Sequence, residues 1–408
     1  MDDINCEHCY PEKSYHVIKK IFTMIDYFAI NPSTYILSKL FLLSENDFLR
    51  FDSLLNKLLT IILQKLKLRT KTNIIDRAQF NNTILALWDE AIKRGLEIYN
   101  FKELKSHTPQ FLLIANQKKY YFIQTPIYLI LQKNINFDYD ITYDNKWIFK
   151  KKLISHDIPC PEGKAFISCK NACKYGIKLG FPLAVKPLTS SLSIHVSYNI
   201  KNLKELKKAI KVVKQVDCRV LIEKHIPGNV YRALIVNNTL IACAMRQPGY
   251  VIGDGVSSIS KLIENNKLAT HKETNDIYLK KIVEAQRVTL DTIIDDGQQI
   301  FISKKVTFGS GAKITNVMDL IHPKNKLLLE RTHQILNLPL TGLDFICEDI
   351  SIPWQKQQFK IIENNSFPYI ELHHNPSECK PINVAGKIWD YVLDNLKEVP
   401  EEQISNAN

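Results

Sequence analysis

The chain carries GLDFICEDIS at residues 342–351 and KIIENNSFP at residues 360–368. Each segment is a short apolar run with acidic or amide residues beside it, which is the pattern of a β-strand. The polar stretch between them is long enough to form a loop that joins two antiparallel strands. We therefore expect Asp344 in the first strand and Glu363 in the second to reach a common point at the surface of a sheet.

The side chains at this point favour a metal site. Asp344, Glu363 and Asn365 offer hard oxygen ligands, which Mg²⁺ prefers. A small number of such ligands leaves coordination positions open for phosphate oxygens, so a nucleotide is expected beside the metal. The alternative is a pair of strands that merely end in polar residues.

Two segments further upstream add to this pattern. FPLAVKP at 181–187 predicts a buried strand that ends in Lys186, and VLIEKHIPGNVYRALIV at 220–236 predicts a strand, a connector and a second strand. The connector carries Glu223. It also offers the free backbone groups of three residues, namely Lys224, His225 and Ile226.

This order of strands and polar residues resembles that of the ATP-grasp superfamily. The resemblance rests on four phrases: VKPL at 185–188, the long phrase from Leu221 to Ile263 with its GDG, HPKN at 322–325, and the phrase from Glu363 to Val392. They look like the ATP-grasp regions of cyanophycin synthetases and of bifunctional glutathione synthetases. The likeness extends from about Tyr143 to Leu396.

The resemblance implies an α/β (α+β) protein with an ATP-grasp fold of two α+β subdomains. Glycine is absent before Gly95, and the opening shows apolar residues at helical spacing over 15–29 and 47–68. A helix and strand around Gly95 and a hairpin over 111–123 are expected next. The expected division is a helical N-terminal region (1–75), a small α/β unit (76–142), an ATP-grasp lid subdomain (143–217), a metal-binding subdomain (218–396) and a tail (397–408).

The resemblance also implies the role of each site residue. Asp344, Glu363 and Asn365 match the family's ligands for Mg²⁺, with Mn²⁺ as an alternative. The residues that would bind ATP are Lys186 and Lys146 on the phosphates, and Glu223 with the backbone of Lys224, His225 and Ile226 on the adenine. Arg246 matches an arginine that would bind a substrate carboxylate, and Lys305 matches a basic residue near the phosphates.

The sequence departs from the family pattern at several of these places. The lid loop LTSSLSIHVS (188–197) has Ser190, Ser193 and His195 where glycine is usual, although serine hydroxyls, including that of Ser191, can still bind phosphate. Val230 stands where an acidic residue usually binds the ribose. Asn145 separates Asp144 from Lys146, where relatives have adjacent residues. Asn364 replaces a small apolar residue and is expected to point away from its neighbours along the strand.

Composition excludes several other classes of protein. The 408 residues are 45% hydrophobic and 24% charged, and they contain no apolar run of membrane-spanning length and no secretory signal. The nine cysteines are expected to be reduced thiols of a cytoplasmic protein. A net charge of +12 is the only feature that favours nucleic-acid binding, because no basic tract with interleaved aromatic residues accompanies it.

The expected function is an ATP- and Mg²⁺-dependent carboxylate–amine ligase that acts on an amino acid or a short peptide. A homo-oligomer is left open. The competing hypothesis is a catalytically weak or inactive nucleotide-binding module, which the altered lid loop and Val230 favour. The sequence has no counterpart of the Mur-ligase-like half of cyanophycin synthetase or of a long glutamate–cysteine ligase half. We therefore expect it to be neither full-length enzyme.

Overall fold

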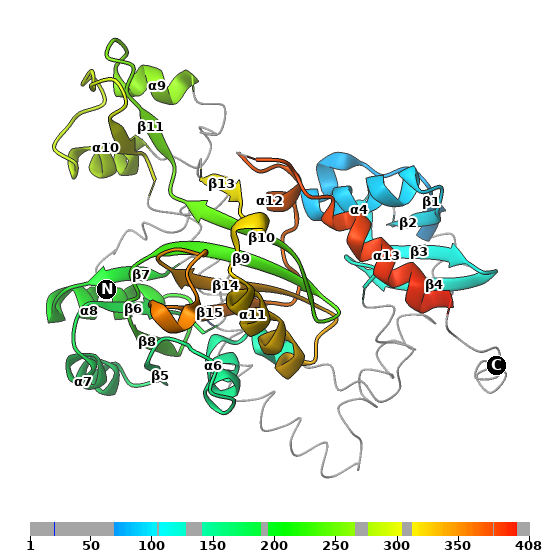
Figure 1. Ribbon diagram of the computed structural model, residues 1–408, viewed down its shortest axis with the longest axis horizontal. Helices are drawn as coiled ribbons and strands as arrows, with labels where there is room; N and C mark the ends of the chain where they lie inside the picture. Colours follow the sequence, from blue (N-terminus) through cyan, green and yellow to red (C-terminus); the bar gives the residue numbers. More distant parts are fainter. Residues whose placement is uncertain are drawn as a thin grey trace.

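The computed structural model describes residues 20, 69–103, 106–127, 141–188, 195–265, 276–303, 312–377 and 379–397. These residues form one five-stranded sheet, two four-stranded sheets and one two-stranded sheet, joined and covered by helices (Figure 1). No helix within these ranges is long and apolar enough to cross a membrane. The helices expected over 15–29 and 47–68 fall outside them, apart from Lys20.

A five-stranded antiparallel sheet carries the expected metal ligands. Its strands lie in the order β13 (Lys313–Asn316), β10 (Thr239–Gln247), β9 (Asn229–Val236), β14 (Leu340–Cys347) and β15 (Lys360–Asn365). Helix α11 (Pro323–Leu336) packs on one face, in a core that includes Tyr231 and Ala233 of β9. Because side chains alternate along a strand, Arg232 and Leu234 point to the opposite face. The polar site lies on that opposite face.

A four-stranded antiparallel sheet has its strands in the order β5 (Gly163–Phe166), β8 (Val220–Lys224), β6 (Leu183–Lys186) and β7 (Ser197–Ile200). Three of these strands come from the range expected for the lid subdomain (143–217), and one, β8, comes from the range expected for the metal-binding subdomain (218–396). Helices α7 (Cys169–Leu179) and α8 (Leu203–Val213) cover it with one shared core. A Cβ added at Gly176 of α7 would come within 2.6 Å of the Leu206 side chain, so glycine allows the two helices to approach closely.

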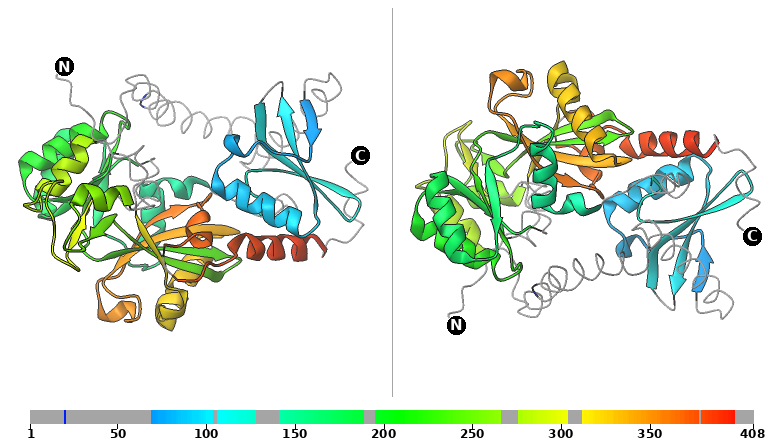
Figure 2. Two further views of the ribbon diagram at one scale, coloured as in Figure 1. Left: turned by 90° about the horizontal axis from the view of Figure 1, so that it is seen from above. Right: turned by 90° about the horizontal axis from the view of Figure 1, so that it is seen from below.

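The second four-stranded sheet packs against helices from both ends of the described chain. Its strands are β1 (Arg69–Thr72), β2 (Glu97–Glu103), β3 (Ser106–Ala115) and β4 (Lys118–Ile123). The pairing of β3 with β4 confirms the hairpin expected over 111–123. Helices α4 (Asn82–Lys93) and α13 (Val384–Lys397) lie side by side in both views of Figure 2. The buried Trp389 of α13 donates its indole N–H to the Leu87 carbonyl at 2.8 Å.

A small unit projects from the end of β10, at the upper left of Figure 1. It contains β11 (Tyr250–Ile252), α9 (Ile259–Asn265), α10 (Asp276–Glu284) and β12 (Gln299–Phe301), with a core of its own. The GDG phrase forms its first turn. Asp254 accepts hydrogen bonds from the N–H groups of Val256 and Ser257, and these bonds lower its pKa to about 2. A Cβ at Gly253 would lie 2.2 Å from the Asp295 carbonyl oxygen, so the phrase serves a tight turn.

Shorter elements complete the described part of the chain. They are the helix α6 (Lys146–Ile154), the one-turn helix α12 (Glu371–His374) and four 3₁₀ helices, η2 (Arg77–Gln79), η3 (Ile141–Asp144), η5 (Met318–Leu320) and η6 (Trp354–Lys356). Asn145 caps α6, because its side chain accepts from the N–H groups of Trp147 and Ile148. This capping role explains why Asn145 separates Asp144 from Lys146.

The stability of this fold is expected to fall as the pH is lowered from about 6.5 to about 4. His333 of α11 is fully buried with Nδ1 2.8 Å from the Thr341 hydroxyl, and burial lowers its pKa to about 4. Between this pKa and the ordinary value of 6.5, the unfolded chain binds a proton that the folded chain excludes, so acid favours unfolding. The loss from this group is at most about 3 kcal/mol. Urea unfolding of a His333→Gln variant should show a shallower pH dependence over this window. An unchanged dependence would contradict the assignment.

Candidate functional site

The segments 342–351 and 360–368 contribute to two paired strands, as expected. Strand β14 runs antiparallel to β15, and the register places Asp344 opposite Glu363 and Gly342 opposite Asn365. Residues directly opposite one another in an antiparallel pair share a face of the sheet. Asp344, Glu363 and Asn365 therefore lie on one face, as expected, and this face is the one opposite α11.

Asp344 is more deeply buried than a site at the sheet surface implies, and it is engaged by two arginines. The carboxylate is 5% exposed and forms ion pairs with Arg232 of β9 and with Nη2 of Arg246 of β10, the latter at 2.7 Å. Burial raises the pKa of Asp344, but the two guanidinium charges outweigh burial and leave the pKa below its usual value. The expectation of a surface carboxylate is corrected here, because β9 and β10 bring two charges that stabilise the buried anion.

Glu363 is more accessible and pairs with a lysine from another element. Its Oε1 lies 3.1 Å from Nζ of Lys146, which is the first residue of α6 and is buried. Asn365 donates its side-chain N–H to the Gly342 carbonyl at 3.3 Å. The side chain of Asn364 points to the opposite face, where it donates to Asp144 at 3.2 Å.

Asp144, in the segment before α6, is hydrogen-bonded to the end of strand β15. Its Oδ1 accepts from the Ser366 N–H at 2.8 Å and from the Ser366 hydroxyl at 2.9 Å, in addition to Asn364. Burial raises the pKa of this carboxyl group. The contact ties the end of β15 to the N-terminus of α6, so it fixes Lys146 relative to Glu363. Sequence reasoning missed this role of Asp144.

A second cluster of buried charges lies at the end of the four-stranded sheet. Glu223 of β8 is 1% exposed and forms ion pairs with two ammonium groups, Nζ of Lys150 at 2.7 Å and Nζ of Lys186 at 2.8 Å. Burial raises the pKa of Glu223, but the charges of Lys186 and Lys150 outweigh it and hold the pKa below its usual value. Sequence reasoning singled out Glu223 and Lys186 but missed Lys150, whose signal is its spacing of four residues from Lys146 on the same helix.

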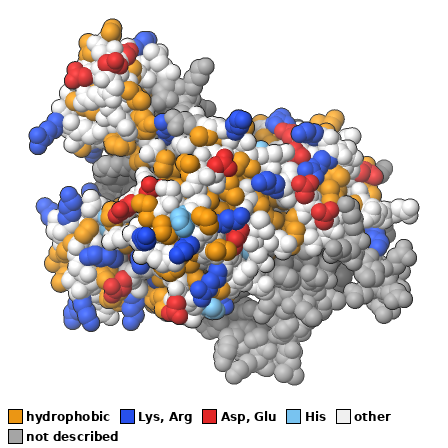
Figure 3. Space-filling model, viewed as in Figure 1, with side chains coloured by type: hydrophobic (Ala, Val, Ile, Leu, Met, Phe, Trp, Pro, Cys, Tyr) orange, Lys and Arg blue, Asp and Glu red, His pale blue; other side chains and the backbone are white. Residues whose placement is uncertain are grey.

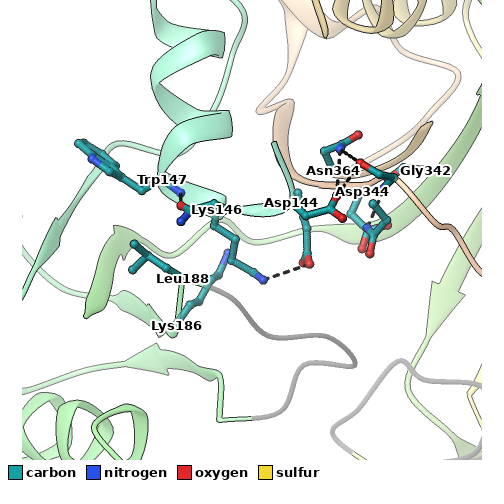
Figure 4. A network of polar contacts seen from close by, with 12 residues as sticks. Asp144, Lys146, Trp147, Lys186, Leu188, Gly342, Asp344 and Asn364 are labelled. Carbon is teal, nitrogen blue, oxygen red and sulfur yellow. Dashed lines mark hydrogen bonds and ion pairs between the residues drawn. The ribbon is translucent and has the colours of Figure 1, made fainter. Parts of the chain in front are cut away.

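The two clusters of charged side chains are neighbours, because the charge of Glu363 contributes with that of Glu223 to raising the pKa of Lys186. Figure 4 shows Lys146 of α6 and Lys186 at the end of β6 next to one another, and it shows Asp144, Asn364 and Asp344 on the other side of the site. The main-chain N–H of Lys146 also bonds to the Leu188 carbonyl at 3.1 Å. The arrangement therefore joins the end of the four-stranded sheet, α6 and β15 around one polar site.

The connector after Glu223 differs in part from its expected form. The N–H of Lys224 donates to the Glu162 carbonyl at 2.8 Å, and the N–H of His225 donates to the Pro182 carbonyl at 3.0 Å. These two N–H groups are thus not free, because neighbouring segments already pair with them. The N–H of Ile226 has no such partner within the part of the chain that the structure describes.

The lid loop lies mostly outside the described residues, and so do Ser190, Ser191, Ser193 and Lys305. His195 is described, is fully buried and has a φ of 59°. This is the left-handed conformation that glycine adopts freely and that histidine adopts more often than most residues. His195 thus has the backbone conformation that glycine at this position would supply.

The histidines near the site do not form a metal centre. His373 of α12 is 2% exposed, and burial together with the charges of Arg232, His374 and Arg246 lowers its pKa to about 3. Among the described residues, no group of three or more His, Cys, Asp or Glu side chains is placed to hold a metal ion. Two carboxylates and an amide oxygen fit a divalent cation that takes its remaining ligands from phosphate. A cation bound by Asp344 would take the place of ion pairs that this carboxylate forms with Arg232 and Arg246.

The fold is that of ATP-grasp proteins: a five-stranded antiparallel sheet has carboxylates on β14 and β15, and a smaller four-stranded sheet carries Lys186 and Glu223. Residues 162–248 match the family model described as D-ala D-ala ligase C-terminus. The ATP-grasp domain resembles those of cyanophycin synthetase and of bifunctional glutathione synthetase.

The similarity to these proteins covers a large part of this chain and a smaller part of each relative. Cyanophycin synthetase of Trichormus variabilis is 29% identical over 273 residues, which are 64% of this chain and 30% of the relative. The glutathione biosynthesis bifunctional protein of Clostridium perfringens is 23% identical over 75% of this chain and 40% of its own length. The crystal structure of a bifunctional glutathione synthetase from Pasteurella multocida matches with a TM-score of 0.55 and 18% identity over 76% of this chain and 43% of that chain. The chain thus spans less than half the length of these relatives.

Proposed function

We propose that the chain is an ATP- and Mg²⁺-dependent ligase that joins a carboxylate to an amine, with an amino acid or short peptide as substrate. The observation that carries the proposal is the convergence of Lys146 and Lys186 with Glu363 and Asp344 around one polar site. Phosphoryl transfer depends on positioned cations that stabilise charge on the transferred group. This site supplies such cations next to oxygen ligands of the type that Mg²⁺ prefers.

Each residue of the site has a part in the proposed reaction. Lys186 and Lys146 bind and orient the ATP phosphates, and Glu223 with the Ile226 N–H reads the adenine edge, since a carboxylate accepts from the exocyclic amine. Asp344, Glu363 and Asn365 would hold Mg²⁺ or Mn²⁺, which would neutralise phosphate charge when bound. Arg246 is suited to a substrate carboxylate because its buried Nε has no hydrogen-bond partner within the described residues.

The reaction proceeds through an acyl phosphate. A substrate carboxylate oxygen bonds to the γ-phosphorus of ATP, and the bond from this phosphorus to the ADP oxygen breaks. The amine then attacks the acyl carbon, phosphate leaves with its bonding electrons, and the proton of the amine passes to water. The charged states of both steps lie where Lys146, Lys186 and Arg246 provide positive charge.

The competing proposal, a nucleotide-binding module with little activity, rests on the altered lid loop and on Val230. The conformation of His195 weakens the case for this inactive module, because His195 adopts the positive φ that glycine would supply at this position of the lid loop. On the face shown in Figure 3, Lys and Arg side chains are interspersed with acidic and apolar ones, so this face offers no continuous basic patch for nucleic acid.

Release of ADP in the presence of a panel of amino acids and dipeptides tests the proposal. The ligase is expected to release ADP only when a suitable carboxylate is present, and hydroxylamine should trap the acyl phosphate as a hydroxamate. ATP binding without ADP release or hydroxamate formation for any member of a broad panel would favour the inactive module.

A further inference from the structure

Lys150 is a buried lysine on the face of helix α6 that packs against the rest of the protein. The buried residues of α6 are Lys146, Phe149, Lys150 and Leu153, which share one face of the helix. Lys150 is 3% exposed and also donates a hydrogen bond to the Pro161 carbonyl. Burying an ammonium group costs free energy unless the group is paired with an opposite charge. The role of Lys150 is therefore to be sought in its ion pair with Glu223.

The charges around Glu223 are unequal. One carboxylate lies between two ammonium groups, with Lys150 on Oε1 and Lys186 on Oε2. Without Lys150, Glu223 and Lys186 would form a neutral pair. With Lys150 present, the three side chains together keep one positive charge, and Lys186 is the member that ends its strand and lies next to Lys146 (Figure 4).

We propose that Lys150 is a positioning residue for ATP that acts through Glu223. It compensates the carboxylate charge, so that the charge of Lys186 remains available to a triphosphate, and it holds Glu223 in place by its second oxygen. Lys150 itself does not touch the nucleotide. The inference rests on the proposed function, since it assumes that Lys186 binds the phosphates of ATP.

A double-mutant cycle tests whether Lys150 acts through Glu223. ATP affinity is measured by calorimetry on the full chain for Lys150→Met, for Glu223→Gln and for the double variant. Lys150→Met alone should weaken ATP binding by roughly tenfold, because Glu223 would then neutralise Lys186 and weaken its charge-assisted contact with the phosphates. In the Glu223→Gln background the same change should alter affinity by less than about twofold, because the neutral amide no longer neutralises Lys186. Equal losses in both backgrounds would show a merely structural role and overturn the proposal, as would no loss in either.

Two further variants guard against misfolding. Lys151→Met removes an exposed lysine from the next position of α6 and should leave ATP affinity unchanged. If Lys150→Met does not fold, Lys150→Gln keeps a polar group but removes the charge, and it should weaken ATP binding to a similar degree. Wild-type affinity in a folded Lys150→Gln variant would overturn the proposal.

Inorganic triphosphate serves as a second probe, because it has phosphates but no base. Its affinity should fall in Lys150→Met by a factor similar to that for ATP. A loss confined to ATP would overturn the role in phosphate binding. A wild-type chain that binds neither ATP nor triphosphate would refute the proposed function itself, whereas normal wild-type binding without coupling in the cycle would refute only the role of Lys150.

Discussion

Asp344→Asn is expected to lower metal-dependent turnover by more than about 100-fold and also to destabilise the fold. The change removes a proposed metal ligand, and transition-state charge would lose a cation that is worth several kcal/mol. It also leaves Arg232 and Arg246 without the carboxylate that compensates them. Removing one partner of a buried ion pair typically costs about 3–5 kcal/mol. Initial rates at saturating Mg²⁺ measure the first effect, and urea unfolding measures the second.

Two other variants separate the loss of the metal ligand from the loss of stability. Glu363→Gln removes the facing carboxylate, whose side chain is 24% exposed, so turnover should fall with a smaller loss of stability. Glu348→Gln changes an exposed acid just beyond the end of β14 and should change neither quantity. Wild-type turnover in Asp344→Asn or Glu363→Gln would refute the metal assignment.

Lys186→Ala is expected to weaken ATP binding by roughly 10- to 100-fold, because the phosphates lose a charge-assisted hydrogen-bond donor. Burial lowers the pKa of Lys186, but the charge of Glu223 outweighs it and holds the pKa above its usual value, so the lysine is charged at neutral pH. The variant should remain folded because Glu223 keeps its ion pair with Lys150. Calorimetry with ATP provides the measurement, and Lys164→Ala on the exposed side of β5 is the control. Unchanged affinity in Lys186→Ala would falsify its role as a phosphate ligand.

The strands of the site could be predicted from the sequence because each is a short apolar run with polar residues at a definite offset. The pairing of β14 with β15 followed from the loop length between them, and it brought Asp344 opposite Glu363. The packing of the site's charges could not be predicted in the same way. Arg232 lies more than a hundred residues from Asp344 along the chain, and its contact depends on the register of β9 against β14.

The burial of particular lysines depends on partners from other elements, so spacing along a helix alone does not predict it. Lys150 lies in the phrase KWIFKKK, where a lysine is ordinarily part of a solvated helix face, and its burial is explained by its partners Glu223 and the Pro161 carbonyl. Conversely, GDG is specific enough to support the resemblance, yet in the structure it forms the turn of a projecting unit. The connector N–H groups of Lys224 and His225 were misjudged because their partners belong to other segments.

Helix α6 is tied by ion pairs to both the five-stranded and the four-stranded sheet of the ATP-grasp domain. Lys146 holds Glu363 of the five-stranded sheet, and Lys150, one helical turn later, holds Glu223 of the four-stranded sheet. A helical turn is stiff and advances by only about 5–6 Å. If one sheet rotates against the other, the helix can follow only one of them without breaking an ion pair. The two sheets are therefore expected to move as a unit near α6, so that flexibility between them is confined to segments further from this helix.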